Sequence, residues 1–128
     1  MKIAIDGTAG SGKGTLSKRL SKRFNIPYLD TGILYRKVAH DFLLRFGKTN
    51  LQENLVKKEI IELVNTINFE FLNLDELKKD EIGFFASQIA KISELRDKLN
   101  IFQIDFVNSM TQTKGGCILD GRDIGTTI

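Results

Sequence analysis

Apolar residues recur along the chain with two different periods, which predict strands and helices in turn. Three short apolar segments read as strands: residues 2–5, 26–30 and 117–119. Four longer segments have apolar residues every three or four positions and read as helices: residues 12–24, 32–46, 51–67 and 82–110, the last broken near Ser93. Because strands and helices alternate, we expect an α/β fold with a mostly parallel sheet.

The periodicity also predicts which side chains face the core. In the helix at 12–24, Leu16, Leu20 and Phe24 should point inward, with a basic outer face. In the helix at 51–67 the expected inward positions are Leu55, Ile60, Leu63, Val64 and Ile67. Residues 68–72 alternate with period two and predict a half-exposed strand, and the polar stretch 73–81 predicts a turn region.

Composition narrows the class of protein. The 128 residues are 41% hydrophobic and 27% charged, as in an ordinary single domain. A net charge of +3 is too small to indicate a nucleic-acid binder, and no apolar run is long enough for a membrane span. Charges start at Lys2, too early for a signal peptide, so a cytoplasmic protein is expected. Cys117, the single cysteine, excludes a disulfide framework and should be a buried filler.

A glycine-rich segment follows the first predicted strand and precedes the first predicted helix. Residues 7–13 read Gly-Thr-Ala-Gly-Ser-Gly-Lys, the spacing of a phosphate-binding loop. Glycines let successive N–H groups point into one concavity, and the helix adds its positive dipole end. The residues predicted to bind phosphates are Gly7, Thr8, Ala9, Gly10, Ser11, Gly12, Lys13, Gly14 and Thr15. Lys13 is the predicted catalytic cation, and Thr15 is a candidate for Mg²⁺, directly or through water; the alternative is a purely structural glycine turn.

Two further motifs follow predicted strands. At the start of the helix at 32–46, Thr31 can act as an N-cap or bind a ligand, and Arg36 can bind a phosphate or lie on the helix surface. Residues 120–123 place two carboxylates and an arginine at the C-terminal end of a strand, where ligands bind in open α/β sheets. There Arg122 is a candidate for a phosphate and Asp123 for a sugar hydroxyl or a base amine; the alternative is a buried salt-bridge turn.

Four motifs taken together resemble bacterial cytidylate kinase. They are Ile-Asp-Gly-Thr-Ala-Gly-Ser-Gly-Lys-Gly-Thr (5–15), Tyr-Leu-Asp-Thr-Gly-Ile-Leu-Tyr-Arg (28–36), Ala-Ser-Gln-Ile-Ala (86–90) with Leu95-Arg96, and Leu-Asp-Gly-Arg-Asp-Ile-Gly-Thr (119–126). The resemblance implies a P-loop NTPase-type three-layer α/β/α fold and transfer of the γ-phosphate of ATP, with Mg²⁺, to CMP or dCMP. It also implies a set of monophosphate-binding residues: Thr31, Arg36, Ser87, Arg96, Arg122 and Asp123.

The resemblance further predicts how the chain is organised. We expect one partial kinase domain over 1–128, with a shortened insert at about 68–83. Family members continue past the last motif with two more strands, an arginine-rich lid and an adenine-binding loop, so this chain is expected to be a C-terminally truncated member with about three of five strands. The family implies a monomer, and an uncovered sheet would allow self-association.

Two other functions remain open at this point. One is a catalytically inactive remnant that at most binds nucleotide phosphates, and the other is a different small P-loop phosphotransferase. No role with nucleic acid or membranes is expected, and His40, the single histidine, is not expected to be catalytic.

Overall fold

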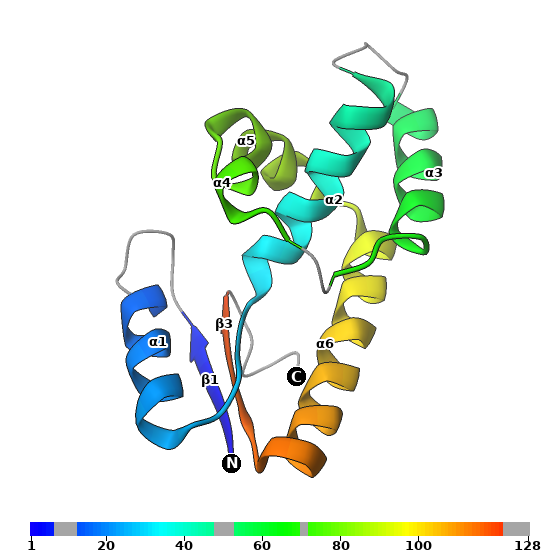
Figure 1. Cartoon of the computed structure of the whole chain (residues 1–128). Coiled ribbons are helices and arrows are strands. Elements are labelled where there is room, and N and C mark those ends of the chain that lie inside the picture. Colours follow the sequence, from blue (N-terminus) through cyan, green and yellow to red (C-terminus); the bar gives the residue numbers. More distant parts are fainter. Residues whose placement is uncertain (7–12, 48–52, 70–71, 122–128) are drawn as a thin grey trace. The chain divides into compact units, whose positions relative to one another are not determined.

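The structure is a computed structural model that describes residues 1–6, 13–47, 53–69 and 72–121. The chain divides into two compact units (Figure 1). We call Met1–Thr31 with Asn100–Ile128 the sheet unit, and Gly32–Leu99 the helical unit. The single kinase domain over 1–128 and the shortened insert at about 68–83 stay predictions.

The sheet unit contains three parallel strands, β1 (Lys2–Asp6), β2 (Tyr28–Asp30) and β3 (Cys117–Gly121). It also contains helix α1 (Lys13–Phe24) and, from Asn100 onward, the C-terminal part of helix α6, which as a whole spans Ser93–Lys114. The strand order is β1-β3-β2, so every residue of the central strand β3 is buried while β1 lies at an edge and is only partly covered. Figure 1 shows α1 and α6 on opposite sides of the strands. The parallel α/β fold expected from the sequence is therefore confirmed, with three strands among the described residues.

A compact apolar cluster joins α6 to one face of the sheet. Its buried members are Val107 of α6 and Cys117 and Leu119 of β3, and Leu29, Phe106 and Met110 pack against them. Cys117 and Leu119 are two residues apart and so lie on the same face of the strand. Cys117 is fully buried, as its placement in a short apolar strand predicted.

The face that α1 turns inward differs from the prediction. Leu16 and Phe24 are 48% and 43% exposed, and the residue that α1 buries completely is Ser17. Ser21, one turn later, donates its hydroxyl proton to the carbonyl of Ile26. The prediction was wrong because it followed the spacing of the apolar residues, whereas small serines line the buried side of this helix.

A double-glycine turn connects α6 to β3. Gly115 and Gly116 have positive φ angles of 80° and 154°, and a Cβ added at Gly116 would lie 1.9 Å from the carbonyl oxygen of Met1. The same oxygen accepts a hydrogen bond of 2.9 Å from the Cys117 amide. Glycine at position 116 therefore lets the start of β1 lie directly against the start of β3.

The helical unit consists of α2 (Thr31–Phe46), α3 (Glu53–Val64), α4 (Leu74–Leu77), α5 (Asp80–Ile89) and the first turns of α6. Helix α2 ends where predicted, before Gly47. Gly47 has a φ of 70° and donates its amide proton to the main-chain carbonyl of Leu43. The core contains buried apolar residues from each of these helices: Leu34, Val38, Ala39, Phe42, Ile60, Leu63, Val64, Leu77, Ile82, Ala86, Ile89, Leu95 and Leu99. The predicted break near Ser93 is confirmed, because α5 ends at Ile89 and α6 begins at Ser93.

Three predictions in the helical unit were wrong. Residues 68, 69 and 72 are not in a strand, while 70–71 lie outside the described residues. A strand needs a neighbour for its backbone hydrogen bonds, and all strands in the described ranges belong to the sheet unit. The stretch 73–81 contains α4 and the start of α5 instead of a turn alone; the Asn73 side chain caps α4 by accepting from the Glu76 amide at 3.3 Å. Leu55 also departs from the prediction, since it is exposed.

Within the described ranges, no helix combines the length and the apolar character that crossing a membrane would require.

Candidate functional site

The three parallel strands end at one edge of the sheet, and the candidate phosphate loop starts there. Strand β1 ends at Asp6 and α1 begins at Lys13, so the structure places a strand before the glycine-rich segment and a helix after it. The loop residues predicted to bind phosphate lie outside the described residues: Gly7, Thr8, Ala9, Gly10, Ser11 and Gly12. Gly14 and Thr15 form the first turn of α1, where Thr15 is exposed and nothing lies within 4 Å of a Cβ added at Gly14.

Asp120 is the most unusual side chain at this edge. It is 1% exposed, and neither carboxylate oxygen has a hydrogen-bond partner in the part of the chain that the structure describes. In the ladder it stands opposite Ile5 of β1 and Asp30 of β2, one residue before the ends of β1 and β3. A buried polar group without a partner is rare and unfavourable, so its two oxygens call for a ligand such as a cation.

Sequence reasoning gave roles to Arg122 and Asp123 but none to Asp120. Arg122 and Asp123 lie outside the described residues. The signal for Asp120 was present, because a carboxylate that ends a fully apolar strand in a parallel sheet stands at the ligand-binding edge.

Tyr28 lies on the same face of the sheet as Asp120, since Tyr28 pairs with Ile118, two residues before Asp120. Burial raises the pKa of Tyr28, and the neighbouring Asp120 carboxylate raises it further. Hydrogen bonding to the Asp120 side chain is the second cause of this raised pKa, although neither carboxylate oxygen meets the full geometry of a hydrogen bond among the described residues. The Tyr28 phenol therefore lies where its O–H can donate to the Asp120 carboxylate.

Thr31 ties the end of β2 to the end of β3. Its side chain is buried, and its hydroxyl donates a 2.8 Å hydrogen bond to the main-chain carbonyl of Asp120. This bond holds the start of α2 beside the strand end that carries the unpaired carboxylate. The predicted contact of Thr31 with a monophosphate stays a prediction.

The other predicted monophosphate ligands that the structure describes belong to the helical unit. Arg36 of α2 is half-buried, and its Nη1 donates a 2.7 Å hydrogen bond to the carbonyl of Leu77 at the end of α4. Its guanidinium also lies against the backbone of Gly83 in α5. Arg36 is therefore not a simple surface residue, which was the alternative interpretation of the sequence.

Ser87 and Arg96 remain exposed within this unit. Ser87 lies one helical turn after Gly83, so it shares the face of α5 on which the Arg36 guanidinium rests. Burial raises the pKa of Tyr35, and the positive charge of Arg96 lowers it in part. Arg36, Ser87 and Arg96 thus come from three helices of the same unit, and their joint contact with a monophosphate stays a prediction.

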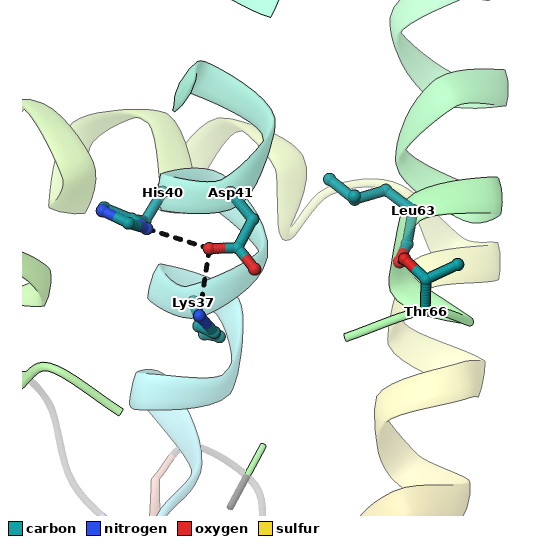
Figure 2. A network of polar contacts seen from close by, with 5 residues as sticks. All are labelled: Lys37, His40, Asp41, Leu63 and Thr66. Carbon is teal, nitrogen blue, oxygen red and sulfur yellow. Dashed lines mark hydrogen bonds and ion pairs between the residues drawn. The ribbon is translucent and has the colours of Figure 1, made fainter. Parts of the chain in front are cut away.

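His40 belongs to a separate polar network on α2. Figure 2 shows Lys37 and His40 directed at the carboxylate of Asp41, with distances to Oδ1 of 3.1 Å from Lys37 Nζ and 2.9 Å from His40 Nδ1. Each of these side chains is about one-fifth exposed. The network pairs neighbouring residues of a single helix, and no group of three or more possible metal ligands occurs among the described residues.

Comparison with known proteins agrees with the motifs. The model of the family described as cytidylate kinase matches residues 3–128. The chain is 41% identical over 126 residues to a cytidylate kinase of Acidiphilium cryptum, covering 98% of this chain and 55% of the relative. It is 39% identical over 128 residues to one of Xanthobacter autotrophicus, covering 100% and 57%, and 40% identical over 126 residues to one of Bartonella henselae, covering 98% and 54%.

The chain spans about half the length of the curated relatives it matches. Its three parallel strands, with a glycine-rich segment between β1 and α1, have the arrangement of an incomplete P-loop NTPase-type α/β fold. With the family model matching almost from end to end, the chain belongs to the cytidylate kinase family.

Proposed function

We propose that this chain carries the ATP phosphate site and monophosphate-binding residues of a cytoplasmic kinase that converts CMP or dCMP to CDP or dCDP. A phosphate oxygen of the monophosphate attacks the γ-phosphorus of ATP, the bond from that phosphorus to the β,γ-bridging oxygen breaks, and ADP leaves. The observation that carries the proposal is the buried, unpartnered carboxylate of Asp120 beside the strand that leads into the glycine-rich segment.

The residues present fit Mg²⁺. Magnesium prefers oxygen ligands and keeps several waters, and Asp120 offers two buried carboxylate oxygens without partners in the described structure. Thr15 adds an exposed hydroxyl in the first turn of α1. When bound, the ion neutralises charge on the β- and γ-phosphates.

The chain's own groups supply the rest of the phosphate site. The amides at the start of α1 and the positive end of its dipole favour a polyanion. Lys13 adds a full positive charge at that helix start. Phosphoryl transfer depends mainly on positioning and charge stabilisation, so no general base is needed for this assignment.

On the monophosphate side, the proposal gives Arg36 the phosphate and Ser87 and Arg96 further polar contacts. The planar guanidinium suits phosphate oxygens because it can donate two parallel hydrogen bonds. Thr31, Arg122 and Asp123 complete the proposed set. The preference for a cytosine base rests on the family.

Calorimetric titration with Mg·ATP tests the ATP site. We expect Lys13→Ala to weaken binding by about ten- to a hundredfold, because a charged hydrogen bond contributes roughly 1.5–3 kcal/mol. Lys18→Ala is the matched control, since Lys18 is an exposed cation on the same helix. Equal affinities for the wild type and Lys13→Ala would contradict the assignment.

Saturation-transfer NMR with CMP, dCMP and AMP tests the substrate class. We expect stronger signals for the two cytidine nucleotides than for AMP. A clear preference for AMP would refute the proposed substrate while leaving the ATP site untouched.

A further inference from the structure

Gly83 occupies a position where the helix itself does not require glycine. It lies inside α5, and its backbone is not among the positive-φ glycines of the described residues, which are Gly47, Gly115 and Gly116. Glycine in a helix interior is less favourable than alanine by about 0.8–1.0 kcal/mol. A neighbouring group that a side chain would displace is a physical reason for glycine at such a position.

That neighbour is the guanidinium of Arg36. A Cβ added at Gly83 would lie 2.7 Å from Nη2, 3.0 Å from Cζ and 3.1 Å from Nη1 of Arg36. Ordinary contact with a Cβ begins at 3.4 Å, so the nearest nitrogen would have to move by about 0.7 Å. All three atoms belong to the far end of a flexible side chain, so the arginine would move and the helix would stay.

A second contact fixes the direction of the same group. Nη1 donates to the Leu77 carbonyl at 2.7 Å, and the Leu77 side chain is itself buried in the core of the helical unit. The guanidinium is thus held by an anchored carbonyl of α4 and by the bare backbone of α5. One of its five N–H groups is used by Leu77, which leaves others for a ligand.

We propose that Gly83 is a positioning residue for the nucleoside monophosphate. Its missing side chain provides the place where the Arg36 guanidinium rests, and it thereby orients that group toward the monophosphate's phosphate. Ser87, one turn along the same face of α5, is exposed, and its hydroxyl donates its proton to the Phe84 carbonyl, which leaves the oxygen's lone pairs as acceptors. This inference rests on the proposed function of Arg36.

The experiment compares Gly83→Ala with wild type in CMP titrations followed by NMR or calorimetry, and in thermal unfolding. We expect CMP affinity to fall at least tenfold, because a displaced arginine can no longer make its paired hydrogen bonds. The melting temperature should stay equal or rise, since alanine favours the helix. Gln88→Ala, at an exposed position of the same helix, should change neither quantity.

A double-mutant cycle separates positioning from a merely structural effect. In an Arg36→Ala background, Gly83→Ala should cause no further loss of CMP affinity, because the displaced group is gone. Gly83→Ser adds the same Cβ with a different helix propensity and should reproduce the loss seen with alanine. Additive losses in the cycle would overturn the proposal.

The remaining outcomes are also decisive. If Arg36→Ala leaves CMP affinity unchanged, the proposed role of Arg36 fails and the role of Gly83 fails with it. If Arg36→Ala weakens binding but Gly83→Ala does not, the positioning role alone fails. Unfolding of Gly83→Ala would overturn it as well, because the proposal requires the flexible guanidinium, and not the helix, to yield.

Discussion

Replacing Asp120 with asparagine should stabilise the protein in the absence of a metal ion. Asparagine has nearly the same size but no charge, and the carboxylate it replaces is 1% exposed without a hydrogen-bond partner in the described structure. A buried polar group left unsatisfied costs roughly 1–3 kcal/mol, and more when it is charged. The asparagine side chain stays polar, so we expect a gain of about 1 kcal/mol, the difference between a hydrogen bond that a charged group lacks (roughly 1.5–3 kcal/mol) and one that a neutral group lacks (roughly 0.5–1.5 kcal/mol).

The assay is thermal unfolding followed by circular dichroism in EDTA. For a domain of this size, 1 kcal/mol corresponds to about 4 °C, so Asp120→Asn should raise the melting temperature by roughly 4 °C. Asp105→Asn is the matched control, because Asp105 is an exposed carboxylate on α6 in the sheet unit. Its change should stay within about 0.5 kcal/mol, as for most surface substitutions.

Adding Mg²⁺ with ATP should make the wild type more stable than Asp120→Asn, the reverse of their order in EDTA. A ligand at a hundred times its dissociation constant stabilises the native state by about 2.7 kcal/mol, and Asp120→Asn should lose most of this gain. Two results would refute the assignment of Asp120 as a cation ligand. One is a variant that is less stable than the wild type in EDTA, and the other is a variant that Mg·ATP stabilises as much as the wild type.

Two further pairs of substitutions test contacts at the two opposite ends of the sheet. Thr31→Val keeps the shape of the side chain but removes the buried hydrogen bond to β3, so chemical denaturation should show a loss of about 1 kcal/mol, whereas Thr113→Val, which removes an exposed bond within α6, should be nearly neutral. Gly116→Ala places a Cβ 1.9 Å from the Met1 carbonyl oxygen, whereas the Cβ of Gly115→Ala meets nothing within 4 Å. Gly115→Ala should therefore lower the free energy of unfolding by roughly 1–3 kcal/mol through backbone strain alone, and Gly116→Ala should lower it by well over that. Equal losses within either pair would contradict these contacts.

The elements that the sequence predicts correctly are those with local causes. Helix α1 starts where a glycine-rich segment ends, and α2 stops at Gly47 because the left-handed cap favours glycine. The parallel sheet follows from strands separated by helices, and β3 is recognisable as a short apolar run after a double glycine. Each of these inferences needs only neighbours within a few residues.

Predictions that depended on a distant partner did less well. The alternation at 68–72 suits a strand, but the helical unit provides no strand in its described residues to pair with it. Leu16 and Phe24 are spaced like an inward face, yet α1 buries Ser17. Periodicity reports how residues are distributed around a helix; it does not report which side the neighbouring element occupies.

The site shows the same division between local and distant causes, with one difference. Asp120 ends an apolar strand, and Gly83 interrupts a good helical pattern, so both break a local rule that the surrounding sequence obeys. Such a break can be seen in the sequence, but its meaning cannot, because the unpaired oxygens of Asp120 and the guanidinium above Gly83 are visible only after folding. A bound ligand would explain a locally unfavourable residue in two cases. The residue fits one particular neighbour, as Gly83 fits the Arg36 guanidinium, or it lacks a hydrogen-bond partner in the described structure, as Asp120 does. Asp120 and Gly83 meet this condition in different units of the fold, and the experiments proposed for them share one prediction: the substitution that removes the local penalty should leave the free protein at least as stable and weaken its nucleotide binding.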